Sequence, residues 1–164
     1  MSSHDQPDSR HFRSVMGHLP TGVVVVAGRS SSGDLVGVTI GSFVSISLEP
    51  PLAGFFIASG SSSWHRIAET GRFCASVLGV DQEEWCWRFA RDSESRFDGV
   101  PHSPGVNGAP RITGSVAWIE CDVEQVTRVG DHDFVLGRVT TLEAATTSAG
   151  AMTFYKGSVG GTAR

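Results

Sequence analysis

A chain of 164 residues is long enough for one domain with a sizeable core and short for two. Its formal net charge of −4, with both signs interspersed, argues against a nucleic-acid surface or a polybasic membrane patch. No apolar run is long enough to span a bilayer, and residues 1–12 lack the apolar core of a signal peptide. We therefore expect a cytoplasmic protein without membrane or nucleic-acid partners.

Strands predominate in the predicted order of elements, with hairpin-type links between them. Residues 1–8 are polar and are expected to form a disordered tail. The predicted helices cover residues 9–19, 61–70 and 81–91, with a serine capping each of the first two. The predicted strands cover residues 21–28, 37–51, 52–59, 72–79, 115–127, 134–144 and 151–157.

Some details of these elements can be tested against the structure. Asp81 and Glu84 have the spacing of a capping box at the start of the third helix. Strand 52–59 is apolar at successive positions and is predicted to be buried on both faces. Residues 92–114 are rich in Ser, Gly, Pro and Asn and are predicted to form a long loop.

About seven strands with two or three short helices indicate a mainly β protein, a small antiparallel barrel with helices over its ends. Strands do not alternate with helices of crossover length, and no glycine-rich dinucleotide motif follows a strand, so a Rossmann domain is excluded. We expect one domain over residues 9–158 and a flexible tail over residues 159–164.

No metal site is expected, because the cysteines are widely spaced and no two histidines have the spacing of a metal-binding motif. Cys74, Cys86 and Cys121 are interpreted as reduced, mostly buried residues, since free cysteine behaves as a small hydrophobic side chain.

The predicted strand Gly37–Pro51 has an unusual polar face. Its polar positions are nearly all small, namely Thr39, Gly41, Ser42, Ser45 and Ser47. Small residues let a planar ring approach the main chain, and hydroxyl and amide groups can bond to the polar edge of that ring. The alternative is a solvent-facing strand that happens to be rich in Ser and Thr.

Three further segments are candidate ligand contacts. The serines of Ser59–Ser63 precede a helix and could form an anion site or a plain cap. His132 follows a Gly-Asp turn, and a lone histidine is more often structural or merely exposed than functional. Arg96–Phe97 and Phe154–Gly157 place a cation beside an aromatic ring, which suits a heterocycle or a phosphate but also an ordinary surface.

Read in chain order, seven segments resemble the short-chain flavin reductase family, the reductase components of two-component flavin-dependent monooxygenases. They are FRSVMGHLPTGVVVVAG, GVTIGSFVSISLEPPL, SSSWHRIAETGRFCASVLG, RF, GSVAWIECDV, GDHDFVLGRV and FYKG, and together they cover residues 10–157. Two positions depart from the family pattern. Many members have Asn or Gln at the position of Gly41, and the Lys of FYKG, Lys156, is often Arg.

The resemblance implies a split β-barrel of Greek-key type that binds FMN or FAD and takes NADH or NADPH as hydride donor. It also implies a homodimer, with the flavin near the subunit interface, and a partner oxygenase. The implied flavin contacts are Thr39, Ile40, Gly41, Ser42, Phe43, Ser45, Ile46, Ser61, Ser62, Ser63, Arg96 and Phe97. The implied nicotinamide contacts are Asp131, His132, Phe154, Tyr155 and Lys156.

The expected activity is hydride transfer from NAD(P)H to flavin, with His132 positioning the nicotinamide. Three alternatives stay open at this stage: a flavin carrier or sensor without reductase activity, an oxidase of the pyridoxamine-phosphate type, and an interaction barrel without ligand. The residues do not separate FMN from FAD, nor NADH from NADPH.

Overall fold

The computed structural model describes residues 6–91, 95–146 and 149–162. The helices are α1 (Ser9–Met16), α2 (Ser62–Ala68) and α3 (Glu83–Ala90). The first strands are β1 (Thr21–Gly22), β2 (Val24–Arg29), β3 (Leu35–Ile40), β4 (Val44–Ser47), β5 (Leu52–Ala58) and β6 (Arg72–Val77). The remaining strands are β7 (His102–Pro104), β8 (Pro110–Ile112), β9 (Ala117–Val129), β10 (His132–Ala144), β11 (Met152–Tyr155) and β12 (Ser158–Gly161).

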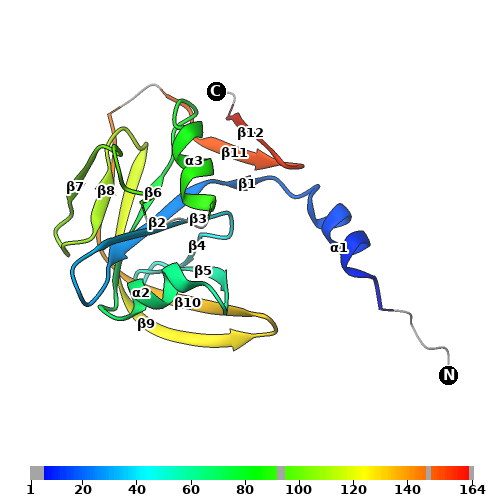
Figure 1. Ribbon diagram of the computed structural model, residues 1–164, viewed down its shortest axis with the longest axis horizontal. Coiled ribbons are helices and arrows are strands. Elements are labelled where there is room, and N and C mark those ends of the chain that lie inside the picture. Colours follow the sequence, from blue (N-terminus) through cyan, green and yellow to red (C-terminus); the bar gives the residue numbers. More distant parts are fainter. Residues whose placement is uncertain (1–5, 92–94, 147–148, 163–164) are drawn as a thin grey trace.

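A curled antiparallel sheet dominates the molecule (Figure 1). Its strand order is β3-β2-β6-β9-β10-β5-β4, so β3 and β4, which follow each other in the chain, lie at its two opposite edges. The connecting residues 41–43 therefore cross the opening between these edges. Two smaller sheets, β1-β11-β12 and β7-β8, complete the fold. The predicted mainly β, antiparallel split barrel is confirmed.

Strand β2 is buried on both faces, which accounts for the run of valines in the sequence. Val24 and Val26 point into the barrel, where they pack with Phe55 and Phe73. Val25 points the other way, into a second apolar cluster beneath α3. A strand sandwiched between two apolar layers reads as a continuous hydrophobic run, because neither face meets water.

Helix α2 closes one end of the barrel. Trp64 and Ile67 are almost fully buried, and the Trp64 ring meets Phe55 edge-on at a centroid distance of 5.5 Å. Ser61 caps the helix, since its hydroxyl accepts a hydrogen bond from the Trp64 amide at 3.2 Å. The apolar face thus fixes the direction in which the helix starts, and the serines lie at that start.

The polar stretch 37–51 is two strands, which corrects the prediction of one. Strand β4 pairs with β5 only as far as Val44 opposite Gly54. Beyond that point the Ser42 hydroxyl donates to the Phe56 carbonyl at 3.0 Å and accepts from the Phe56 amide at 2.9 Å. A side chain thereby takes the place of a strand partner at the opening of the barrel.

Other local predictions also need correction. Asp8, not Ser9, caps α1 by accepting from the His11 amide at 2.8 Å. The Asp81–Glu84 capping box does not form, because α3 starts after Gln82 and Glu84 pairs instead with Arg88.

Three further differences concern the strands. The predicted loop 92–114 contains the short strands β7 and β8. Strand β12 lies in the stretch taken for a tail. Phe56 on β5 is 42% exposed, so that strand is not buried on both faces.

We expect Ser42→Ala to lower the free energy of unfolding by about 1 kcal/mol, because the Phe56 amide and carbonyl each lose a partner. Urea denaturation measures the change. Ser45→Ala is the matched control, since that exposed side chain makes no hydrogen bond within residues 6–91, 95–146 and 149–162. Equal stability of the two variants would contradict the role assigned to Ser42.

Candidate functional site

A cavity of about 220 Å³ lies between the start of α2 and the end of α3. Its lining residues are Val38, Gly60, Ser61, Ser62, Ser63, Phe89, Ala90 and Arg96. The first backbone N–H groups of a helix have no partner within the helix, and they attract anions. The structure therefore gathers the three predicted serines and Arg96 around one small polar cavity.

Arg96 is held rigidly at this cavity. Its side chain is almost fully buried, and Nη1 donates to the Ser63 hydroxyl at 2.8 Å and to the Gly37 carbonyl at 2.7 Å. Gly37 lets α3 come close, because a Cβ atom there would lie 2.8 Å from the Phe89 ring. A fixed guanidinium beside a helix start is suited to bind a phosphate group.

Two hydroxyls of the predicted flavin surface, those of Thr39 and Ser42, already make hydrogen bonds within the protein. Thr39 donates to the Cys86 carbonyl at 2.7 Å, and Ser42 is bonded to Phe56 as described above. Each hydroxyl carries one hydrogen, so toward a ligand both can only accept a bond. Ile40 is buried in the barrel core, whereas Ser45 and Ile46 are exposed on β4.

Gly41 sits where β3 approaches β1. A Cβ atom at this position would lie 3.1 Å from the Thr21 hydroxyl, so a larger residue would need space that Thr21 occupies. The Thr21 hydroxyl is itself buried and has no hydrogen-bond partner among the residues that the structure describes. The glycine at this position, where many members of the resembled family have Asn or Gln, thus has a packing reason.

Arg96 and Phe97, predicted to act together, point into different surroundings. The Phe97 ring packs edge-on against Phe89 at 4.9 Å and against His102 at 5.4 Å. It lines a separate groove of about 810 Å³ that also contains Arg66 and His102. Phe97 therefore does not line the serine cavity.

Asp131 and His132 form a pair at the tip of the β9–β10 hairpin. His132 Nδ1 lies 2.7 Å from Asp131 Oδ1, and this hydrogen bond, with the attraction between the two groups, lowers the pKa of Asp131. The Ser59 amide donates to the Asp131 carbonyl at 3.1 Å, and the Ser59 hydroxyl donates to Asp133 at 2.9 Å. These bonds fix the hairpin tip beside the loop that leads into α2.

The other predicted nicotinamide contacts lie on β11 and in the turn that follows it, at a different border of the predicted flavin surface. Phe154 is paired with Thr21, which is the neighbour of Gly41, and its ring meets Trp87 at 6.3 Å. Lys156 has a left-handed backbone with φ of 48°, and its ammonium lies 5.5 Å from the centre of the Tyr155 ring. Figure 1 shows β11 and the β9–β10 hairpin on either side of β4.

Residues 16–163 match the family described as flavin reductase like domain. The chain belongs to the flavin reductase-like family. A flavin reductase of Pseudomonas putida is 42% identical over 154 residues, which cover 94% of this chain and 90% of that protein. The resemblance seen in the sequence is therefore confirmed.

Two solved structures show the same fold. Nitrilotriacetate monooxygenase component B from Mycobacterium thermoresistibile has a TM-score of 0.91 and is 36% identical, covering 95% of this chain and 87% of that one. The NADH:FAD oxidoreductase SgcE6 of Streptomyces globisporus, in complex with NAD and FAD fragments, has a TM-score of 0.89 and is 34% identical, covering 99% of this chain and 98% of that one.

The residues of this family member fit a flavin. The rigid Arg96 guanidinium and the α2 serines could bind the flavin phosphate. Sequence reasoning missed Gly37, which accepts the Arg96 bond, and Trp87, which contacts Phe154. The run Trp87–Arg91, WRFAR, carried a signal for Trp87, since it alternates aromatic and basic residues on a helix.

The cysteines of this flavin reductase-like protein are all buried and free. Burial, followed by repulsion from the buried Glu120, raises the pKa of Cys74 to about 12. Burial likewise raises the pKa of Cys121 to about 12. Within the described ranges no three His, Cys, Asp or Glu residues are grouped to hold a metal ion, and no helix is long and apolar enough to cross a membrane.

We expect the free energy of unfolding to fall as the pH rises from about 9 toward 12, because the folded thiols of Cys74 and Cys121 keep their protons to a higher pH than unfolded ones. Urea denaturation at about pH 8 and about pH 10.5 measures the effect. The double variant Cys74→Ala/Cys121→Ala should lose part of this dependence. The same loss in both proteins would show that the thiols do not cause it.

Proposed function

We propose that this protein reduces FMN or FAD with NADH or NADPH and passes the reduced flavin to a separate oxygenase component. The main support is the buried Arg96, which is fixed by Ser63 and Gly37 at a cavity where a helix begins. Membership of the flavin reductase-like family and the functions named for its relatives support this proposal.

The flavin, when bound, would supply the acceptor for a hydride from the nicotinamide ring. The work of this chain is to hold both molecules in a reactive arrangement. We propose that Arg96 and the α2 serines bind the flavin phosphate. The backbone of residues 39–43 would support the ring system, and the β4 residues Ser45 and Ile46 would border it.

The Asp131–His132 pair is suited to position the nicotinamide. When Nδ1 carries the proton and donates a hydrogen bond to Asp131 Oδ1, the other ring nitrogen, Nε2, can accept one. A nicotinamide carboxamide offers an N–H donor for such an atom. His132 is thus proposed as a positioning residue; hydride transfer to flavin does not require it as an acid or a base.

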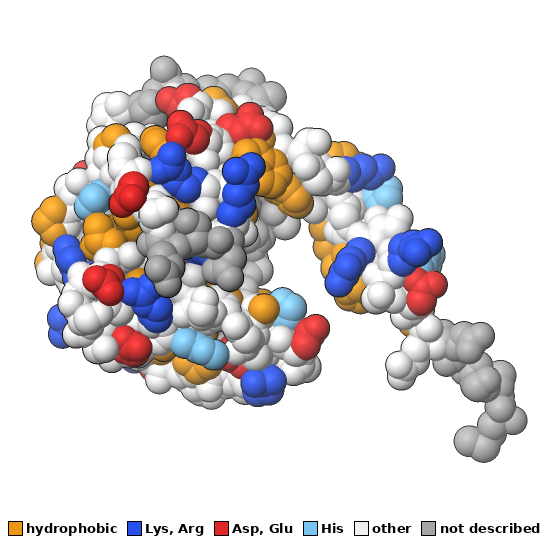
Figure 2. Space-filling view, viewed as in Figure 1, with side chains coloured by type: hydrophobic (Ala, Val, Ile, Leu, Met, Phe, Trp, Pro, Cys, Tyr) orange, Lys and Arg blue, Asp and Glu red, His pale blue; other side chains and the backbone are white. Residues whose placement is uncertain are grey.

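We further propose that the protein is a homodimer. Helix α1 buries none of its residues and extends away from the body of the chain (Figure 2). Phe12, Val15, Met16 and Leu19 on this segment are each 45–58% exposed. An eight-residue helix has little stability alone, so an apolar partner surface is needed to hold it.

The body of the chain exposes apolar residues that a second copy could cover. They are Val44, Ile46, Phe56, Val126 and Val129, each 42–51% exposed. This surface on the body includes Ile46, which is proposed above to border the flavin, and this fits a site near a subunit interface. The three free cysteines also favour a reducing compartment, and we propose the cytoplasm.

The deciding assay follows the oxidation of NADH and of NADPH with FMN or FAD added in turn. We expect oxidation that depends on added flavin. Flavin binding without oxidation of either nucleotide would point to a carrier or sensor and would overturn the proposed activity.

We expect His132→Ala to raise the KM for the nicotinamide nucleotide by up to about tenfold, because its hydrogen bond to the carboxamide is lost, while flavin affinity changes less. Steady-state kinetics and flavin titration measure the two effects. His65→Ala is the control, since this exposed α2 residue lines none of the described cavities. An unchanged KM for NAD(P)H in His132→Ala would contradict the role assigned to His132.

The dimer is tested by Val15→Asp, which places a charge on the apolar face of α1. Light scattering should show a dimer for the unmodified chain and a shift toward monomer for the variant, because burying an unpaired charge is costly. Ser14→Asp adds the same charge to the same exposed helix, away from the apolar residues, and should leave the dimer intact. A monomeric unmodified chain would disprove the proposal.

A further inference from the structure

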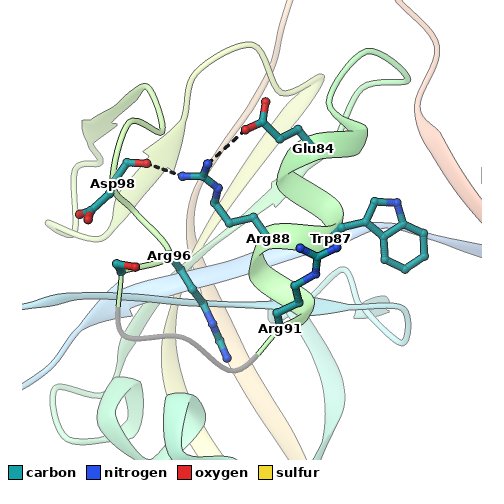
Figure 3. Close-up of a pocket in the computed structure, with 7 residues that line it drawn as sticks. Glu84, Trp87, Arg88, Arg91, Arg96 and Asp98 are labelled. Atoms are coloured by element: carbon teal, nitrogen blue, oxygen red, sulfur yellow. Dashed lines mark hydrogen bonds and ion pairs between the residues drawn. The ribbon is translucent and has the colours of Figure 1, made fainter.

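A larger groove adjoins the serine cavity and shares Arg96 with it. Its volume is about 650 Å³, within the range usual for small-molecule sites. It is lined by Glu84, Trp87, Arg88, Arg91, Ser95, Arg96 and Asp98, and Figure 3 shows the side chains of α3 along it. Because both hollows have Arg96 in their walls, a ligand seated at the serines could continue into the groove.

Arg88 on α3 and Arg91, the residue that follows this helix, differ in how they are engaged. Arg88 donates to Glu84 at 3.1 Å and to the carbonyl of Asp98, so its charge is largely used within the protein (Figure 3). Arg91 is exposed and makes no hydrogen bond or ion pair with any residue in the described part of the chain. Arg91 is thus a cation at the groove that is available to an anionic ligand.

The groove also has an aromatic wall. The Trp87 indole is held in place by its N–H, which donates to Glu83 at 3.1 Å, and by its edge contact with Phe154. A fixed indole can stack on a nucleobase of any identity, because every base has a flat aromatic face. Arg91 lies about one helical turn after Trp87, so a ligand with a phosphate and a nearby base could contact both residues.

We propose that this groove receives the adenylate half of FAD, with Arg91 on its phosphate and Trp87 against its adenine, so that the protein prefers FAD to FMN. The proposal rests on the function proposed above. FMN and FAD share the first phosphate, and FAD continues from it through a second phosphate and a ribose to adenine. Only FAD can therefore use both hollows at once.

The acidic groups on the groove restrict where the second phosphate can lie. Glu84 is neutralised by Arg88, whereas the segment that carries Asp98 forms the opposite wall. A phosphate near Asp98 would be repelled, and one near Arg91 would be attracted. The phosphate is thus placed on the α3 side, close to Trp87.

The test compares the Kd of FAD and of FMN by calorimetry for the purified protein, without NAD(P)H. We expect FAD to bind at least about tenfold more tightly than FMN, and Arg91→Ala to remove about that factor from FAD alone. Ser62→Ala should weaken both flavins alike, because it alters the shared phosphate site. Arg72→Ala removes the same charge outside both hollows and should change neither Kd.

A second variant, Trp87→Leu, keeps the test decisive if Arg91→Ala does not fold. Trp87→Leu should also weaken FAD selectively, and circular dichroism should show native secondary structure in both variants. Equal Kd values for FAD and FMN, unaffected by Arg91→Ala, would overturn the adenylate groove but leave the reductase proposal standing. Binding of neither flavin would overturn both proposals.

Discussion

The guanidinium of Arg96 connects the parts of the molecule on which the site depends. It joins α2 through Ser63 and β3 through Gly37, and it brings the segment after α3 against both. Burying a cation is costly unless its hydrogen-bonding groups have partners, so these bonds also dictate how α2, α3 and β3 meet. The serine cavity exists because these three elements are held at this separation.

The open side of the barrel is a second constraint. Because β3 and β4 are opposite edges of one sheet, the chain between them cannot pair as an ordinary strand. Ser42 satisfies the backbone of Phe56 there, and Gly41 lets β3 approach β1. The same few residues that close this gap form the surface proposed to support the flavin ring. The same residues therefore determine how the open side of the barrel is stabilised and what shape the proposed site has.

Much of the fold follows from local patterns. The spacing of apolar residues indicates the elements found in β2, β9, β10 and α2. Each spacing can bury its apolar side chains in only one type of element, a strand or a helix. The split at residues 41–43 could not be predicted in this way. It results from the curvature of a sheet whose edges are distant in strand order, and local alternation carries no signal of that curvature. Asp8 was missed as the cap of α1 because Ser9 beside it offers an equally good capping side chain. Gln82 was missed because it precedes α3 without any side-chain capping bond.

For the site, the sequence by itself determined which residue types are present and, through seven ordered segments, the family to which the chain belongs. It also placed three serines at a helix start, since capping is a local property. Only the tertiary structure decided that Arg96 bonds to Ser63 while the adjacent Phe97 packs elsewhere. It alone placed Arg96 in the walls of both the serine cavity and the larger groove beside α3. The reason is that the direction of a side chain and its contacts across the barrel depend on how strands distant in the sequence curl and pack. The residues next to it in the sequence do not encode that packing.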